Sequence, residues 1–408
     1  MPKKYLLSGL LFLFTFLHQA SDGQSVKHLS VKKTLIAATD SILHSQVDQN
    51  KIPGAVIEIK NGNKVIIRKA FGNAGKNEKM TTKHLFDIAS LTKVIGTTTS
   101  VMLLVDNELI SIDDPVCRYI KAFETSDKRT ITIRHLLTHT AGLNEWYPLY
   151  YVSSDKQETY KLIEGLPLKY PVGERRSYSD LGYVLLGEII ENVTGMPLDQ
   201  FMKQNIFGPL RMKNTTYNPL KKGRFKKIAS TSYGNPYEKR MVYDSVLGFR
   251  VPEIDPDSWN GWRTYILRGE VNDGNAWYAC GGISGAAGLF STVDDIQNLV
   301  DMLMKRGKTS AGQFISEKTI DAFLTKDKFN NGLGWMMDPV NSFMRNGPDG
   351  TFGHTGFTGT SISVIPKYKI SVILLINRQN TGLLDNQEYY NVNPIRLQIF
   401  SAVLKYLK

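Results

Sequence analysis

The sequence contains very little cysteine. Cys117 and Cys280 are the only two cysteines among 408 residues. Neither belongs to a C-x-x-C or to another spacing that zinc ligands use, so we expect no cysteine-held metal. Their separation along the chain does not decide whether they form a disulfide, and that question stays open at this stage.

Long apolar runs are also missing beyond the first residues. Two lysines precede an apolar run from Tyr5 to Leu17, and a polar Ser-Asp-Gly-Gln stretch follows, as in a secretory signal peptide. The run is too short to span a bilayer comfortably, which makes an uncleaved membrane anchor the lesser alternative. No cysteine follows that could carry a lipid. We expect residues 1–23 to be removed and residues 24–408 to fold without a membrane span, in the periplasm or cell envelope.

Several common functional motifs do not occur. The absence of G-x-S-x-G argues against an α/β-hydrolase esterase. The glycines between residues 281 and 288 lack the strand and helix context of a dinucleotide site and are better read as a turn that lines a substrate. His135 and His139 are four residues apart, but the glutamate of a metalloprotease helix is missing. We expect these two to be core or capping histidines.

Acidic residues are too few to balance the basic ones, and the formal net charge is +12. Such a charge favours anionic surfaces such as the bacterial wall, or nucleic acid. No nucleic-acid motif accompanies Lys221-Lys222 or Lys226-Lys227. We expect these lysines to be solvated and predict no nucleic-acid partner.

Hydrophobic periodicity predicts strands near both ends of the chain and helices between them. An Asn-Gly turn at residues 61–63 joins the first two strands into a hairpin. This order predicts an α+β fold, with an antiparallel sheet built from both chain ends, flanked by N- and C-terminal helices, and a mostly helical region inserted. The sheet lobe would comprise about residues 30–95 and 330–408. Expected helices are 31–47, 90–110, 133–137, 181–193, 198–206 and 394–407; expected strands are 55–60, 65–70, 360–365 and 370–377.

The first candidate for chemistry is the tetrad from Ser90 to Lys93. Residues i and i+3 share one face of a helix, so the amine lies beside the hydroxyl. The amine can take or relay the serine proton if desolvation and neighbours lower its pKa. An S-x-x-K tetrad also arises by chance in many chains, so it needs supporting residues.

Two further segments supply polar groups. Tyr178 precedes Ser179-Asp180 at the start of a predicted helix, and a nearby cation would lower the pKa of its phenol so that it could act as a base. Packing of Tyr178 at a helix start, with Asp180 as cap, is the alternative. A glycine-rich entry to the strand 360–365 contains His354, Thr355, Gly356 and Phe357. Its glycines would admit a substrate, its polar groups would contact a carbonyl or carboxylate, and a nearby amide would help to form an oxyanion hole.

The ordered set S-x-x-K, Y-S-D and H-T-G resembles the serine β-lactamase and penicillin-binding-protein superfamily. The stretch Ile131–Leu143 is similar to its class C-like branch. Residues 276–291 look like the penicillin-binding protein 4B group and related exo-acting muramoyl-alanine amidases. The resemblance implies Ser90 as nucleophile, Lys93 as its activating partner and Tyr178 as base, with the amides of Ser90 and Phe357 as oxyanion hole. His354 stands where many relatives have lysine.

Two departures narrow this expectation. Asp180 replaces an asparagine that contacts the substrate in class C β-lactamases, which puts efficient cephalosporin hydrolysis in doubt. Ala286 stands where close relatives often carry histidine.

The resemblance implies acyl-enzyme hydrolysis of peptidoglycan-derived peptides, first as a D-Ala-D-Ala carboxypeptidase, with no metal or cofactor. An exo N-acetylmuramoyl-L-alanine amidase, a small-ester hydrolase or weak β-lactamase, and a penicillin-binding sensor or pseudoenzyme are the alternatives.

Overall fold

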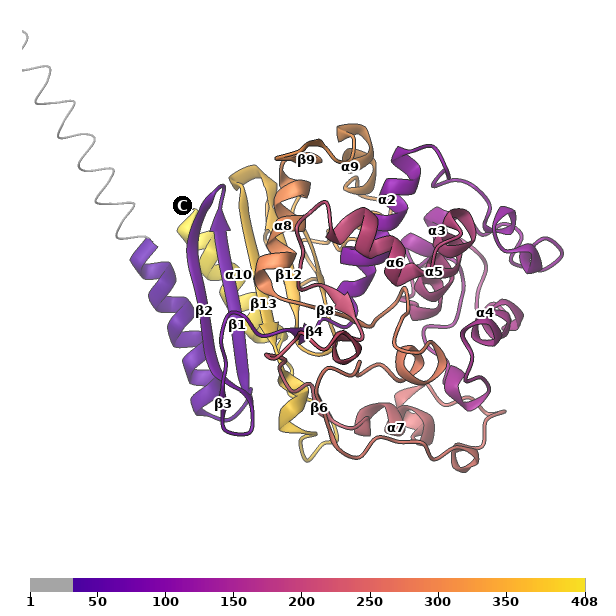
Figure 1. The fold of residues 1–408 in the computed structure, drawn as a ribbon, viewed down its shortest axis with the longest axis horizontal. Coiled ribbons are helices and arrows are strands. Elements are labelled where there is room, and N and C mark those ends of the chain that lie inside the picture. Colours follow the sequence, from indigo (N-terminus) through magenta and orange to yellow (C-terminus); the bar gives the residue numbers. More distant parts are fainter. Residues whose placement is uncertain (1–31, 408) are drawn as a thin grey trace, which may run out of the picture.

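A six-stranded antiparallel sheet forms one side of the molecule (Figure 1). A computed structural model describes residues 32–407, so the expected signal peptide and Val31 lie outside the described residues. The strand order β11-β12-β13-β1-β2-β3 joins both ends of the chain, as predicted. The strands are β1 (Gly54–Asn61), β2 (Lys64–Gly75), β3 (Glu78–Lys79), β11 (Phe352–Thr355), β12 (Ser361–Ile365) and β13 (Ile370–Ile376).

β1 occupies the centre of this sheet. On one side Ala55 pairs with Ile376 of β13, and on the other Ala55 pairs with Phe71 of β2. The predicted hairpin of β1 and β2 is confirmed, and Gly62 turns it with a φ of 53°, which glycine adopts without cost. The first strands therefore depend on the last ones for a partner.

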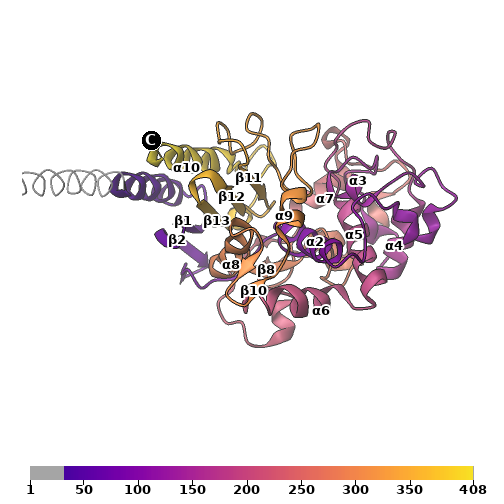
Figure 2. The same ribbon diagram turned by 90° about the horizontal axis from the view of Figure 1, so that it is seen from above.

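The terminal helices cover one face of the sheet, which confirms this part of the predicted architecture (Figures 1 and 2). Residues 32–48 and α10 (Asn393–Tyr406) are helical. Leu43 and Phe400 from these helices share one apolar cluster with Ile57 of β1. Alternate residues of β1 point to this cluster, as expected for a strand whose two faces are both covered.

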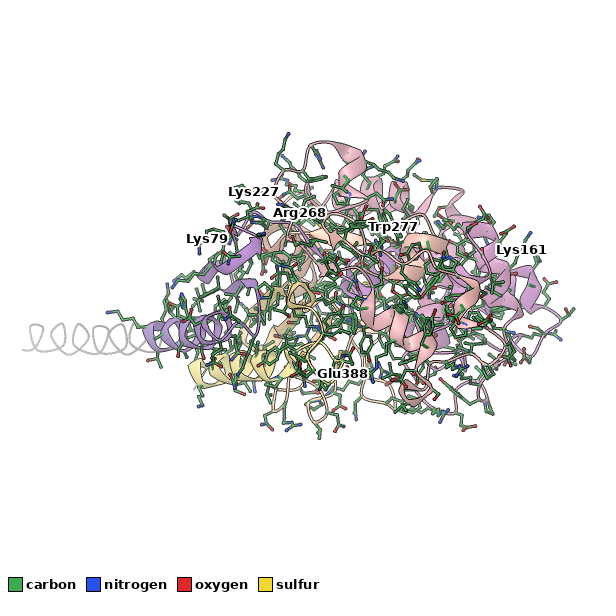
Figure 3. All side chains as sticks on the ribbon, turned by 90° about the horizontal axis from the view of Figure 1, so that it is seen from below. Lys79, Lys161, Lys227, Arg268, Trp277 and Glu388 are labelled. Atoms are coloured by element: carbon green, nitrogen blue, oxygen red, sulfur yellow. The ribbon has the colours of Figure 1, made fainter. Side chains whose placement is uncertain are left out.

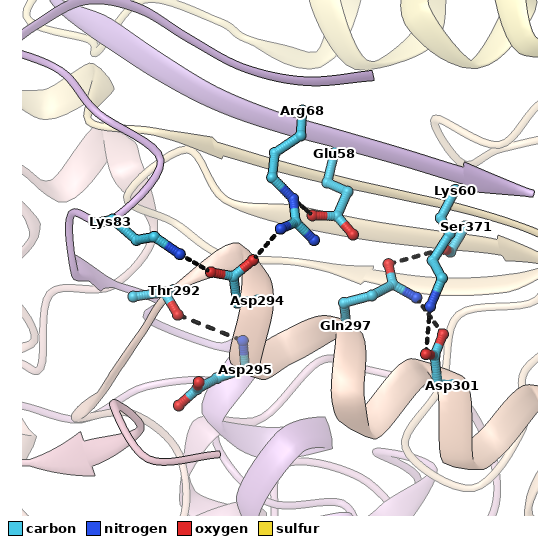
Figure 4. Close-up of polar contacts among 10 residues, drawn as sticks. All are labelled: Glu58, Lys60, Arg68, Lys83, Thr292, Asp294, Asp295, Gln297, Asp301 and Ser371. Atoms are coloured by element: carbon cyan, nitrogen blue, oxygen red, sulfur yellow. Dashed lines mark hydrogen bonds and ion pairs between the residues drawn. The ribbon is translucent and has the colours of Figure 1, made fainter. Parts of the chain in front are cut away.

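The other face of the sheet packs on α8 (Val293–Met304) through a polar network (Figure 4). Arg68 bonds to the fully buried carboxylate of Glu58, and its Nη1 is 2.8 Å from Asp294 Oδ1. Lys60 pairs with a further carboxylate of α8. Burial raises the pKa of Glu58 even though Arg68 pulls it down. The network fixes α8, and with it the segment leading into it, against the sheet.

The region between the chain ends is largely helical and lies beside the sheet (Figure 2). Its central helix, α5, buries almost every residue from Leu181 to Ile190. The helix expected over 90–110 is instead a π-helix, Lys93–Thr98, followed by α2, and it ends at Asp106. Apart from α8, the α-helices of this region are α2 (Thr99–Asp106), α3 (Ile133–Leu137), α4 (Lys156–Gly165), α5 (Asp180–Thr194), α6 (Leu198–Met202), α7 (Pro236–Tyr243) and α9 (Glu317–Phe323). α6 continues as a π-helix, Lys203–Phe207.

A small second sheet stands between the two regions. It has the order β4-β8-β5, and β4 leads directly to Ser90. Its strands are β4 (Phe86–Asp87), β5 (Thr216–Tyr217) and β8 (Leu289–Ser291). Two further antiparallel pairs are β6 (Ser232–Tyr233) with β7 (Ile266–Leu267), which are far apart in the chain, and the hairpin of β9 (Lys308–Thr309) with β10 (Gly312–Gln313).

Three smaller expectations can be compared with the described residues. Cys117 and Cys280 are free thiols. Within residues 32–407, no helix combines the length and the apolar character that crossing a bilayer requires. Lys226 and Lys227 are exposed, as predicted, and Figure 3 shows Lys227 beside Arg268 at the surface.

Candidate active site

Ser90 is placed by a strained turn at the end of β4. The Ile88 amide donates to Leu289 O of β8 at 3.0 Å, which anchors the strand. Ala89 follows with a φ of 45°, and its amide donates to Asp87 Oδ1 at 2.9 Å. A non-glycine residue in the left-handed region costs about 1 kcal/mol, and such strain is concentrated at functional sites. The turn directs Ser90 into a cavity that it helps to line.

Lys93 lies beneath Ser90 and is completely buried. It opens the π-helix, a rare form that often occurs at functional sites. Its Nζ donates to Ser90 Oγ at 3.0 Å and to the Ala286 carbonyl at 2.9 Å, and it lies 2.6 Å from Asp180 Oδ1. Three acceptors surround this nitrogen, and the three N–H groups of an ammonium match them. An ammonium has no lone pair that could receive the serine proton.

A lowered pKa at Lys93, the condition under which its amine could take the serine proton, is not met in this arrangement. Burial alone would lower the pKa of Lys93, but attraction to Asp180 and Tyr178 outweighs burial and raises it. Lys93 is therefore a cation in the resting site. Its charge is available to stabilise an anion that forms beside it.

Tyr178 faces the same pair from a loop. Burial raises the pKa of Tyr178, while Lys93 and a hydrogen bond with Ser90 pull it down without reversing the shift. The Lys93 ammonium is 5.2 Å from the centre of the tyrosine ring. The expected influence of a cation on this phenol is present, but the resting phenol remains protonated.

The two histidines singled out in the sequence are a helix cap and a loop anchor. His135 forms a capping box with Thr132 at the start of α3. His139 accepts from the Ser179 amide at 3.1 Å, and its ring lies 4.4 Å from the Tyr178 ring. His139 thus holds the loop that presents Tyr178, and the prediction of core or capping histidines is confirmed.

Asp180 is the first residue of α5, but Ser179 caps this helix by accepting from the Gly182 amide. The carboxylate of Asp180 is left for Lys93. Deeper in the helix, α5 packs directly against Gly285. A Cβ on Gly285 would be 2.1 Å from the Tyr183 carbonyl oxygen and would also crowd the backbone of Gly187. This close packing allows the carbonyl of the next residue, Ala286, to reach Lys93.

The expected glycine-rich entry to the strand at 360–365 contains a strand of its own: His354 and Thr355 end β11, which pairs with β12, and Gly356 follows them. The turn from β11 to β12 is bonded to the chain before Ser90: Thr358 Oγ1 donates to Asp87 O at 2.7 Å and Thr360 Oγ1 to Ile88 O at 3.1 Å. A Cβ on Gly356 would lie 2.5 Å from Ile88 O, so only glycine fits here. These contacts place Phe357 and Ser90 in the lining of the same cavity.

The amides of Ser90 and Phe357 donate no hydrogen bond to any residue in the described part of the chain. Both residues line the cavity. Free amides beside a nucleophile are what an oxyanion hole requires.

His354 is 2% exposed and neutral. Burial, with help from Lys93, lowers the pKa of His354 to about 3. Its Nδ1 donates to the Thr355 carbonyl at 2.9 Å, which leaves Nε2 as the acceptor of the ring. His354 therefore offers no positive charge to a substrate carboxylate. Thr355 is partly exposed at the end of β11.

Two arginines that sequence reasoning missed hold the loop of Gly356 and Phe357. Arg396, buried on α10, donates to the carbonyls of Gly356 at 3.2 Å and Thr360 at 2.8 Å. Arg378 donates through Nε to the Phe357 carbonyl at 2.9 Å. An isolated arginine in a predicted helix or after a strand carries no motif, so the sequence offered no cue.

The cavity in front of Ser90 has a volume of about 350 Å³. Tyr178 and Asp180 line it beside the nucleophile, and the α7 residues Tyr237 and Glu238 line it at a distance in sequence. Of the residues expected from the sequence, Ser90, Tyr178, Asp180 and Phe357 line this cavity, and Lys93 lies behind Ser90. His354, Thr355 and Gly356 are not part of the lining. The α7 residues carried no recognised motif and were missed.

Comparisons with known proteins agree on one family. A family model described as Beta-lactamase matches residues 39–394. The N-acetylmuramyl-L-alanine amidase of Bacillus subtilis is 31% identical over 95% of this chain and 93% of its own length. A putative D-alanyl-D-alanine carboxypeptidase of Escherichia coli K12 is 34% identical over 86% of this chain and 84% of its own.

Solved structures share the fold. A penicillin-binding protein homologue from Caulobacter crescentus has a TM-score of 0.68 at 17% identity, with 91% of this chain and 97% of that chain covered. The octameric penicillin-binding protein homologue from Pyrococcus abyssi has a TM-score of 0.67 at 22% identity, with 90% and 77% covered.

Proposed function

Because the chain belongs to the β-lactamase family, we propose that it is a serine hydrolase that cleaves peptidoglycan-derived peptides through an acyl-enzyme at Ser90. The observation that carries this proposal is the contact of Ser90 Oγ with the buried Lys93 ammonium, 3.0 Å apart, under two free amides. Names of relatives that span nearly the whole chain support the substrate class.

The proposed reaction uses Lys93 and Tyr178 as one unit. The reactive form is the one in which Tyr178 has already lost its phenolic proton to solvent, and the neighbouring Lys93 cation stabilises that phenolate. Ser90 Oγ attacks the acyl carbon and passes its proton to the Tyr178 phenolate. The amides of Ser90 and Phe357 hold the oxyanion. Tyr178 returns the proton to the departing amine as the carbon–nitrogen bond breaks. Water then attacks the ester at Ser90 and releases the acid.

Two amide bonds of a peptidoglycan peptide are candidates. Carboxypeptidase action on a D-Ala-D-Ala end is supported by relatives at 34% identity. Amidase action on the muramoyl-L-alanine bond is supported by the relative that covers 95% of the chain. The lining of the cavity favours the second candidate, because among residues 32–407 no lysine or arginine faces this space to pair with a terminal carboxylate. Export to the periplasm or cell envelope is part of the proposal, since both substrates occur outside the cytoplasm.

The experiment is intact-mass analysis of the purified protein after incubation with a fluorescent penicillin, with the Ser90→Ala variant beside it. Product analysis on a defined muropeptide follows. We expect a covalent adduct that the variant lacks. Release of D-alanine would identify a carboxypeptidase and release of the whole stem peptide an amidase.

Other outcomes would contradict the proposal. An adduct on Ser90→Ala would move the nucleophile elsewhere. One stoichiometric adduct without turnover on any peptide would indicate a sensor, and turnover confined to small esters would indicate an esterase.

A further inference from the structure

Within residues 32–407, the cavity in front of Ser90 is lined by carboxylates and by no lysine or arginine. Asp180, Asp273, Glu145 and Glu238 line it. Asp180 already has a partner in Lys93, and Glu145, which accepts from Ser177, is exposed. Asp273 and Glu238 are therefore the two carboxylates whose function the catalytic site does not explain.

Asp273 and Glu238 are held from behind by backbone amides. Gly274 N donates to Glu238 Oε2 at 2.8 Å, and Ala276 N donates to Asp273 Oδ1 at 2.7 Å. Burial raises the pKa of Glu238 to about 8 and that of Asp273 to about 6. The Arg263 guanidinium attracts both carboxylates, but Arg263 is 6% exposed and outside the cavity lining, and this attraction does not overcome burial. The site lacks the positive charge that would keep both groups ionised.

A second, independent feature of the cavity points to a ligand. Gln379 lines it and is fully buried, and neither Nε2 nor Oε1 of its amide has a hydrogen-bond partner in the part of the chain that the structure describes. Leaving a buried amide unpaired is unfavourable, because the group loses its hydrogen bonds to water and gains none in return. A peptide group offers one donor and one acceptor and would satisfy both atoms.

The wall between these polar groups is aromatic. The rings of Tyr237, Phe357 and Tyr389 lie 5.5–6.0 Å apart and line the cavity. Arg378 stacks on Phe357 and Tyr389 and is not part of the lining. The rings present an apolar surface on which a chain of methylene groups can pack.

We infer that this cavity is a subsite for a peptide bearing a primary ammonium group on a short apolar arm, with the ammonium at Glu238 and Asp273, the arm on the aromatic wall and a peptide group on Gln379. This inference rests on the proposed function, because it names the class of peptide that Ser90 receives. A free diamino-acid side chain in the peptide has this chemistry.

The test uses two muramoyl pentapeptides that end in D-Ala-D-Ala and differ in one group. Both carry lysine as the third amino acid, with its side-chain amine free in one and acetylated in the other. Two quantities are measured: kcat/KM on the wild type, and the dissociation constant on Ser90→Ala by calorimetry. We expect the free amine to be preferred by about tenfold or more in both, the effect of one partly desolvated charge pair.

Variants then locate the preference. In Glu238→Gln and Asp273→Asn the ratio of the two peptides should fall towards one. Glu124→Gln removes a carboxylate that does not line the cavity and is the matched control, with the ratio of the wild type. Raising the salt concentration should reduce the wild-type ratio.

The outcomes separate this inference from the proposed function. Equal binding of both peptides, or a ratio that survives in both variants, would overturn the inference even if Ser90 hydrolyses them. Preferential binding of the free amine to Ser90→Ala would uphold it even if the wild type cleaves neither peptide, and then only the proposed function would fail.

Discussion

The ammonium of Lys93 has three close acceptors, and one of them is the carboxylate of Asp180. A substitution at Asp180 should therefore change the pKa of Lys93. Asp180 is the charge that keeps the pKa of Lys93 above its ordinary value in spite of burial. In Asp180→Asn, burial dominates, so the pKa of Lys93 falls. Loss of the cation then begins at lower pH.

The pH dependence of acylation should therefore change in Asp180→Asn. We expect the alkaline limb of the labelling rate with fluorescent penicillin to move to lower pH, measured from about pH 6 to about pH 10. Asp385→Asn, which removes an exposed carboxylate, is the control. An unmoved alkaline limb would mean that the charge of Lys93 is not required.

Lys93 and Tyr178 should behave as one catalytic unit. Lys93→Ala and Tyr178→Phe are each expected to lower the acylation rate by about 10²–10⁴, the usual contribution of general acid–base groups. The double variant should be little worse than either single one, because each change already removes the shared proton path. Single-turnover rates of all three variants test this, and multiplicative losses would indicate separate roles.

At the scale of single residues, the sequence predicts which residues form the site better than it predicts their protonation states. The spacing of Ser90 and Lys93 on one helical face was enough to expect their contact. The sign of the pKa shift at Lys93 was not predictable, because it depends on the Asp180 contact, which only the folding of α5 creates. Glu238 and Gln379 were missed because they, too, come to line the cavity only in the folded chain.

Among the elements, α10 has two functions. One side of it covers the sheet with Phe400, and another carries Arg396 to the loop of Gly356 and Phe357. Since Phe357 is the candidate oxyanion donor, the helix at the chain end supports the catalytic amide.

Arg396→Lys should impair catalysis more than substrate binding. A lysine cannot bridge the carbonyls of Gly356 and Thr360 as the planar guanidinium does, so the Phe357 amide loses its fixed position. We expect kcat to fall about tenfold or more with a smaller change in KM, as for loss of a transition-state contact. Arg345→Lys, at an exposed arginine that bonds to one backbone carbonyl, is the control. A change in KM alone, or equal losses in both variants, would contradict this role.

The packing side of α10 makes a separate prediction. Phe400 is 1% exposed against the sheet. Phe400→Ala should lower the free energy of unfolding by about 3–5 kcal/mol. Urea denaturation measures this, with the exposed Lys405→Ala as control on the same helix. A loss below about 1 kcal/mol would show that the helix is not needed to close this apolar cluster.

Elements with strong periodicity were predicted well, and those that depend on distant contacts were not. The hairpin of β1 and β2, together with α3, α5 and α10, follows from alternation or helical spacing. The π-helix that begins at Lys93 was expected as ordinary helix, because apolar periodicity does not distinguish the two forms over six residues. β11 was missed because glycine-rich segments are rarely strands, whereas here glycine permits close approach to Ile88.

For the whole molecule, buried histidines should set the acid sensitivity. The pKa of His354 is about 3 in the fold, below its ordinary value of 6.5. The unfolded chain therefore binds the extra proton first, and stability falls as the pH drops from about 6.5 towards about 3. At about pH 5 this amounts to roughly 2 kcal/mol for this group.

The comparison is between wild type and His354→Gln. Chemical denaturation at about pH 7 and about pH 5 should show a loss of stability that is smaller by roughly 2 kcal/mol in the variant. His44→Gln, at an exposed histidine, is the control. Equal losses in wild type and His354→Gln would place the origin of acid sensitivity elsewhere.

The central position of β1 has a consequence for the order of events during synthesis. Ala55 pairs with Ile376, so more than three hundred residues must be made before β1 acquires its second neighbour. At about 5–20 residues per second, the ribosome needs roughly 15–60 s to supply them. Throughout that interval the nascent hairpin presents an open edge of backbone amides and carbonyls, and such edges invite aggregation. Biogenesis of this protein therefore calls for a chaperone or an unfolded transit state until its last strands arrive.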